Sequence, residues 1–176
     1  MGHFTDTLIE KSTSTSPIIL GLDPNYDHIP KSLHPKDNTN KELQKSLVSW
    51  ARLLIDTCVP FIPAVKIQSA YYEQFGTIGI EAMHDTIKVA KENNLLVILD
   101  VKRGDIGSTS QAYANAYLSS EIEINSEITV KSDLNVDAIT INPLMGEDSI
   151  SPFIDTAIAN QKGIFVLVKT SNPGSE

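Results

Sequence analysis

The chain has 176 residues, of which 41% are hydrophobic, and its 14 Lys and Arg against 22 Asp and Glu give a formal net charge of −8. This length is typical of one domain with a sizeable core, so we expect a single domain over residues 1–176. The acidic balance argues against a nucleic-acid-binding protein, which would carry a basic face. No apolar run is long enough to cross a membrane, and residues 1–16 lack the apolar segment of a signal peptide, which favours a cytoplasmic protein.

Short β-branched runs alternate with helical patterns along the chain. The apolar runs predict strands at residues 16–22, 64–68, 95–101, 138–142 and 164–169. The first helix opens with a capping-box pattern from Thr39 to Glu42, and its apolar stripe ends before Pro60. The only cysteine, Cys58, lies on that stripe, so we expect core packing and exclude an intramolecular disulfide and a thiolate metal cluster.

Three later helical patterns complete a βα repeat. The first lies around residues 80–90, the second begins at about residue 108, and the third lies around residues 150–157. In the second pattern, Gln111 completes another capping box. Residues 12–16 and 119–134 are interpreted as longer surface connections. Five strands at this spacing fit either an open, doubly wound sheet or the first five units of a (β/α)₈ TIM barrel. Both are α/β folds, and the periodicity does not choose between them.

Charged residues appear abruptly at the end of the third apolar strand. Asp100 and Lys102 are two residues apart, so an extended strand would place them on one face, and Asp105 follows in the next loop. Asp23 and Lys66 stand at the ends of the first two strands, where α/β folds build their sites. The simpler interpretations are an ion pair between Asp100 and Lys102 at the strand end, Asp105 as a turn residue and Lys66 as a surface lysine.

Five segments together resemble orotidine 5'-phosphate decarboxylase, in its longer bacterial form, over essentially the whole chain. The segments are Leu22-Asp23-Pro24, Val65-Lys66-Ile67-Gln68, Leu99-Asp100-Val101-Lys102-Arg103-Gly104-Asp105-Ile106-Gly107, Thr140-Ile141-Asn142-Pro143-Leu144-Met145-Gly146 and Val168-Lys169-Thr170-Ser171-Asn172-Pro173-Gly174-Ser175. The resemblance implies a (β/α)₈ barrel of which the chain holds five βα units. It also implies a homodimer that converts orotidine monophosphate to uridine monophosphate and CO₂ without a metal or other cofactor.

The resemblance also implies roles for the charged residues of the third segment. Asp100 would lie beside the substrate carboxylate and Lys102 beside C6 of the pyrimidine. Loss of CO₂ leaves a carbanion in the ring plane, which a fixed ammonium group can stabilise and then protonate. Asp100 and Asp105 would keep Lys102 charged.

The implied binding residues come from four of the five segments, except Thr109, which lies two residues after the third segment. Asp23 and Lys66 match ribose-contacting positions, and Ser171 matches the position that reads the pyrimidine edge. Ile106 and Thr109, with Asp105, match residues that reach into the neighbouring subunit's site. The active site would therefore be shared across the dimer.

Two alternatives compete with this interpretation. A metal-dependent sugar-phosphate decarboxylase of the same barrel superfamily shares the segment from Asp100 to Asp105, but its second strand ends in an acidic metal ligand, where this chain has Lys66 and Gln68. The second alternative is a non-catalytic fragment, because the family's phosphate-binding loops follow later strands. We therefore expect the 176-residue chain alone to be inactive and poorly soluble.

Overall fold

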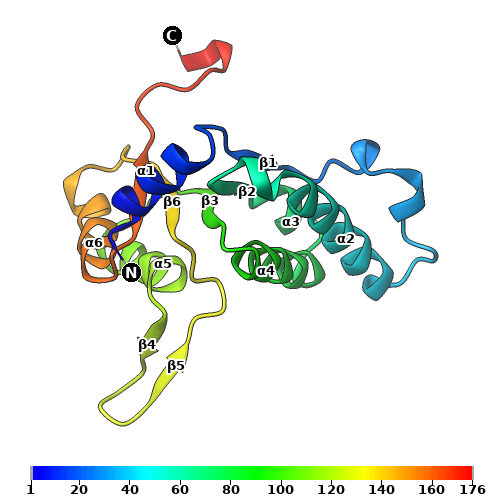
Figure 1. Ribbon diagram of the computed structural model, residues 1–176. Helices are drawn as coiled ribbons and strands as arrows, with labels where there is room; N and C mark the ends of the chain where they lie inside the picture. Colours follow the sequence, from blue (N-terminus) through cyan, green and yellow to red (C-terminus); the bar gives the residue numbers. More distant parts are fainter. Residues whose placement is uncertain (1, 176) are drawn as a thin grey trace. The chain divides into compact units, whose positions relative to one another are not determined.

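The computed structural model describes residues 2–175 of the chain. They form two compact units, one from Thr5 to Asp100 and one from Gly2–Phe4 together with the residues from Val101 onward. Figure 1 shows the ribbon, and each unit is described by itself below. None of the described helices is long and apolar enough to cross a membrane.

The first unit alternates strands and helices. Its elements are α1 (Phe4–Ser14, of which Phe4 belongs to the second unit), β1 (Leu20–Leu22), η1 (Tyr26–His28), η2 (Lys31–Leu33), α2 (Asn40–Cys58), η3 (Val59–Phe61), β2 (Ala64–Gln68), α3 (Ala70–Glu73), α4 (Thr77–Glu92) and the first part of β3 (Leu96–Arg103). β1 pairs with β2, and β2 with β3, both in parallel. Helices α2 and α4 lie side by side (Figure 1).

The buried strands and the amphipathic helix α2 explain the core of this unit. β3 is buried at every position from Leu96 to Val101, as expected for a parallel strand covered on both faces. Leu47, Ala51 and Ile55 on the predicted stripe of α2 are fully buried. Cys58 is the last residue of α2 and is only half-buried. Its thiol is therefore less buried than the predicted core position.

Only half of the first predicted capping box forms. The Thr39 hydroxyl caps α2 by accepting a hydrogen bond from the Glu42 N–H at 3.3 Å. The Glu42 carboxylate accepts from the backbone N–H of Lys36 instead, and the Thr39 N–H donates to the Asp37 carboxylate. These contacts tie residues 36–39 to the first turn of α2.

The second unit continues the alternation. Besides the end of β3 it contains α5 (Gly107–Leu118), β4 (Glu121–Glu123), β5 (Thr129–Lys131), β6 (Ala138–Ile141), α6 (Glu147–Ala159), β7 (Gly163–Val166) and η4 (Pro173–Ser175). β6 pairs in parallel with β7, and α5 packs beside α6. The Asn142 N–H donates to the Arg103 carbonyl at 2.8 Å, which joins the end of β3 to the end of β6.

The N-terminal residues are part of the second unit. The Phe4 N–H donates to the Gln161 carbonyl at 3.0 Å, and the Phe4 ring meets Phe165 edge to face at 6.1 Å between centroids. A Cβ atom on Gly163 would lie 2.2 Å from the Phe4 ring, so only glycine fits there without displacing the ring. The N-terminal segment is thus anchored at the start of β7.

The first predicted strand, residues 16–22, is shorter in the structure, where β1 begins at Leu20, and three further sequence-based predictions about elements need correction. Helix α1 covers most of residues 12–16, which were predicted to be a surface connection. Residues 119–134 contain the β4–β5 hairpin, which extends away from α5 in Figure 1. The second capping box is absent, because the Gln111 amide donates to Asn115 and Thr156 while α5 begins without a side-chain cap.

Candidate active site

In the first unit, polar side chains meet at the carboxyl ends of adjacent parallel strands. The register pairs Leu22 of β1 with Ile67 of β2, and Gln68 of β2 with Asp100 of β3. Asp23 directly follows Leu22, the last paired residue of β1. This edge is where parallel α/β folds place their ligands.

The Asp100 carboxylate is the centre of this cluster. Its Oδ2 atom accepts a hydrogen bond from Lys66 Nζ and another from Gln68 Nε2, each at 3.0 Å. Asp100 is 7% exposed, whereas the Lys66 side chain is 38% exposed. The ion pair therefore joins a buried carboxylate to an ammonium group that also reaches solvent.

The backbone of Asp100 is held from the same segment. Ser69 donates to the Asp100 carbonyl through its N–H at 3.3 Å and through its hydroxyl at 3.2 Å. Ser69 is buried, so these bonds are shielded from water. Residues 66–69 thus hold both the side chain and the main chain of Asp100.

Asp23 adds a negative charge near a buried phenol. Tyr72 of α3 is fully buried and donates to the Thr86 hydroxyl at 3.3 Å. Burial raises the pKa of Tyr72 far above its usual range; the Thr86 hydrogen bond opposes the rise and the charge of Asp23 adds to it. Asp23 itself is exposed.

In the second unit, Lys102 adopts an unusual backbone conformation. Its φ is +46°, in the left-handed region that non-glycine residues rarely occupy. Its N–H donates to the hydroxyl of Thr140 on β6 at 2.9 Å. The prediction that Asp100 and Lys102 share a face assumed an extended strand, and this assumption fails at Lys102.

The loop after β3 is fixed by a buried serine. Ser110 of α5 donates through its hydroxyl to the Asp105 carbonyl at 2.7 Å, and its oxygen accepts from the Asp105 N–H at 3.2 Å. The Asp105 carboxylate accepts from the Ile106 N–H at 2.7 Å. Ile106 is 57% exposed and Thr109 is also exposed, so both side chains are available at the surface of this unit.

The same loop passes close to the one that follows β6. A Cβ atom on Gly104 would lie 2.5 Å from the Asn142 carbonyl oxygen, so a larger residue would push the two loops apart.

Two other side chains of this unit are placed by the structure. Arg103 packs its guanidinium group over the ring of Tyr113 at 5.4 Å. Ser171 is exposed in the segment after β7.

The structure thus brings Lys66 and Asp100 together, in the same unit as Asp23. It places Lys102, Asp105, Ile106, Thr109 and Ser171 in the other unit. The supporting residues Gln68, Ser69, Thr140 and Ser110 were not predicted as site residues. For Gln68 the signal was present, because it lies two residues after Lys66 on the same strand.

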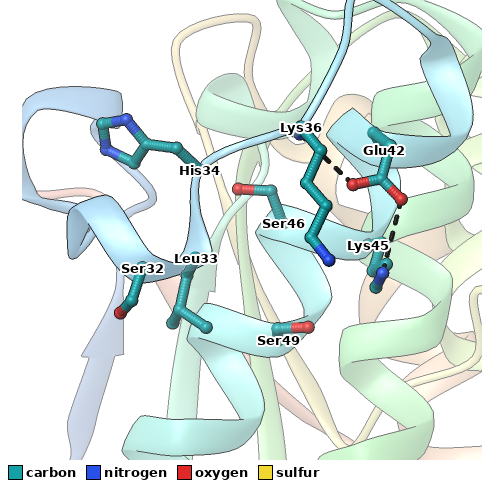
Figure 2. A pocket seen from close by; sticks show the side chains of 8 residues that line it. All are labelled: Ser32, Leu33, His34, Lys36, Glu42, Lys45, Ser46 and Ser49. Atoms are coloured by element: carbon teal, nitrogen blue, oxygen red, sulfur yellow. Dashed lines mark hydrogen bonds and ion pairs between the residues drawn. The ribbon is translucent and has the colours of Figure 1, made fainter.

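The carboxyl ends of β1, β2 and β3 remain the best-supported candidate site in the first unit. Among residues 2–175, no group of three or more His, Cys, Asp or Glu side chains is placed to hold a metal ion. The first unit contains a hollow of about 70 Å³. Figure 2 shows the side chains that line it. Its lining residues are Ser32, Leu33, His34, Lys36, Glu42, Lys45, Ser46 and Ser49, and it includes no predicted site residue.

Comparison with known proteins assigns the chain to a family. The family model described as "Orotidine 5'-phosphate decarboxylase / HUMPS family" matches residues 16–176. The chain belongs to this family of α/β barrel enzymes.

Individual relatives agree with this assignment. The curated orotidine 5'-phosphate decarboxylase of Clostridium perfringens (strain 13 / Type A) is 37% identical over 171 residues, which cover 97% of this chain and 54% of the relative. The structure of Leishmania donovani OMP decarboxylase is 32% identical with a TM-score of 0.73, over 98% of this chain and 56% of that one. A crystal structure from Streptomyces avermitilis, assigned to the same enzyme, is 29% identical with a TM-score of 0.80, over 99% and 56% of the two chains.

The chain therefore spans about half the length of the curated relatives it matches. The likeness over nearly all of it decides between the two architectures that the periodicity left open. The fold is that of a (β/α)₈ barrel, of which the chain holds the first part.

Proposed function

We propose that the whole protein decarboxylates orotidine monophosphate to uridine monophosphate and CO₂ in the cytoplasm, as a step of pyrimidine synthesis. The observation that carries this proposal is the buried Asp100 carboxylate paired with Lys66 at the end of β3, in the segment that leads into Lys102 and Asp105. Membership of the decarboxylase family supports the same reaction.

The reaction requires stabilisation of a carbanion that the pyrimidine ring cannot delocalise. When the bond between C6 and the carboxylate breaks, its electron pair stays on C6 in the ring plane. In the proposal, the ammonium group of Lys102 lies at C6 and interacts more strongly with the carbanion than with the starting carbon. Lys102 then donates its proton to C6, which completes uridine monophosphate.

Two carboxylates assist Lys102 in this proposal. Asp100 would lie beside the substrate carboxylate, and its negative charge would also attract the ammonium group of Lys102. Asp105 would add a second negative charge near that lysine. The left-handed backbone of Lys102 supports a specific role for this residue, since strained conformations persist where the surrounding structure enforces them.

The remaining residues would bind the substrate. Asp23 and Lys66 would contact the ribose, and Ser171 would read the pyrimidine edge. Exposed Ile106 and Thr109 would enter the site of a second subunit in a homodimer. The reaction uses no metal and no organic cofactor in this scheme.

The direct test uses the protein encoded by the complete open reading frame. Decarboxylation is followed by the loss of orotidine monophosphate absorbance, with and without a metal chelator. We expect turnover that the chelator does not change. Failure to act on orotidine monophosphate, together with Mg²⁺-dependent turnover of a sugar-phosphate acid, would contradict the proposal and make Asp100 a metal ligand.

Mixing inactive variants tests the shared site. Lys102→Ala and Asp105→Ala chains are each expected to be inactive as homodimers. If Asp105 acts in the neighbouring site, hybrid dimers contain one site with both residues intact, so mixing and reassembly restores about a quarter of the wild-type rate, from half of the dimers with one of two sites active. No recovery in verified hybrid dimers would refute sharing of Asp105.

A further inference from the structure

We propose that Gln68 is a positioning residue that holds the Asp100 carboxylate in its working orientation. The inference rests on the proposed function, because it gives Gln68 a part in the reaction through Asp100. Gln68 ends β2, and its amide donates to Asp100 Oδ2 at 3.0 Å. Gln68 lies in one of the segments that carry the resemblance, but the resemblance assigned it no role in the reaction.

Two donors from one strand meet at a single carboxylate oxygen. Lys66 and Gln68 are two positions apart, so they project from the same face of β2, and both reach Asp100 Oδ2 at 3.0 Å. Asp100 is 7% exposed, so few water molecules can replace either donor. Two donors on one oxygen restrict rotation of the carboxylate more than one donor would.

The two donors are suited to different tasks. The Lys66 side chain is 38% exposed, and its ammonium group can also turn toward a bound ligand. The Gln68 amide is neutral and planar and has no charge to share with the substrate. It can keep holding Asp100 while Lys66 contacts the ribose.

The absence of charge on Gln68 also avoids repulsion of the Asp100 carboxylate. The register sets Asp100 beside Gln68, and Asp23 directly follows Leu22, whose partner on β2 is Ile67. A carboxylate at position 68 would stand beside the Asp100 carboxylate, with the Lys66 ammonium group as the neighbouring positive charge on β2. Like charges at this spacing repel, so an acidic residue here would turn the Asp100 carboxylate away.

The test compares two substitutions in the complete protein. Gln68→Met keeps the length of the side chain and removes the donor, and we expect kcat to fall about tenfold while KM changes less than threefold. Gln68→Glu also adds the repulsion, and we expect a loss of about a hundredfold at pH 8. At pH 5 to 6 the introduced carboxyl begins to protonate and can donate to Asp100, so Gln68→Glu regains activity relative to wild type while Gln68→Met does not.

A matched control comes from Gln74, whose amide donates to the Tyr71 carbonyl on the exposed surface of the same unit. Gln74→Glu adds the same charge away from Asp100, and we expect both kinetic constants within twofold of wild type. Unchanged kinetics in both Gln68 variants, or losses that only follow a loss of folded protein, would overturn the inference. Inactivity of the wild-type protein toward orotidine monophosphate is a separate result, which would reject the proposed function itself.

Discussion

Two buried serines on helices differ in what their hydroxyl groups contact. Ser46 of α2 is 3% exposed, and its hydroxyl has no hydrogen-bond partner among the described residues; Figure 2 shows it beside the hollow that it lines. The Ser110 hydroxyl, fully buried on α5, makes two hydrogen bonds with the backbone of Asp105. A buried hydroxyl without a partner costs free energy, whereas a bonded one contributes to stability.

We therefore predict opposite effects for the same substitution at these two sites. Ser46→Ala should leave the free energy of unfolding unchanged or raise it by up to about 1 kcal/mol, since alanine also favours the helix. Ser110→Ala should lower it by about 1 to 2 kcal/mol, because the Asp105 backbone loses its partner. Urea unfolding of the complete protein measures both, and a larger loss from Ser46→Ala than from Ser110→Ala would contradict the prediction.

The close approach of Gly104 to Asn142 gives a second prediction at this scale. Gly104→Ala should lower the free energy of unfolding by about 1 to 3 kcal/mol and reduce activity, because the added methyl group overlaps the Asn142 carbonyl and displaces the Asp105 loop. Gly107→Ala is the control, since nothing lies within 4 Å of a Cβ atom there. Equal melting temperatures and rates for the two variants would rule out this role for Gly104.

The hairpin of β4 and β5 is amphipathic. Ile122 faces Val130 in the register, and Ile124 and Ile128 continue the same face, whereas the charged pair Glu121 and Lys131 lies on the other. Ile124 and Ile128 are 61% and 50% exposed. An exposed apolar face on a two-stranded hairpin favours association between molecules.

We predict that replacing both Ile124 and Ile128 by threonine reduces self-association. The substitution retains β-branching, so the hairpin should persist, and the exposed side chains contribute little to the core. Static light scattering should show less aggregate at equal concentration, with a melting temperature within about 2 °C of wild type. More aggregate, or a large fall in melting temperature, would show that this face is packed in the complete protein.

The sequence predicted elements well where a single pattern determines them. β2 has the predicted bounds because its apolar run lies between Pro63 and a helix start, and the Thr39 cap forms because it needs only local contacts. The left-handed conformation of Lys102 left no such signal, and the hydrogen bond from its N–H goes to the Thr140 hydroxyl of another strand. Helix α1 was missed because its mean hydropathy and periodicity are weak.

The same distinction explains how much of the candidate site was predictable. Asp100, Lys102 and Asp105 lie in one short segment, so a motif could indicate them. The donors to Asp100 come from β2, and Ser110 reaches Asp105 from α5, so these contacts require the register and the helix packing. The pairing of Lys66 with Asp100 was not predicted for this reason, although both residues were named.

On the scale of the whole molecule, the chain corresponds to about half of its curated relatives. The side chains of Phe165 and Val166 on β7 are each 41% exposed, whereas every residue of β6 is buried. We predict that residues 1–176 alone form aggregates and do not decarboxylate orotidine monophosphate. Expression of this segment beside the complete open reading frame, with light scattering and the absorbance assay on both, tests the prediction, which ordinary turnover by the segment would refute.

The most direct measurement compares the complete wild-type protein with Lys102→Ala in the decarboxylation assay, with binding of uridine monophosphate measured in parallel. We predict that the substitution lowers kcat by at least about a thousandfold, because in the proposed mechanism Lys102 both stabilises the carbanion and supplies the proton. Product affinity should fall far less, since the proposed nucleotide-binding residues Asp23, Lys66 and Ser171 are unchanged. A Lys102→Ala protein that still turns over orotidine monophosphate at near the wild-type rate would contradict the account.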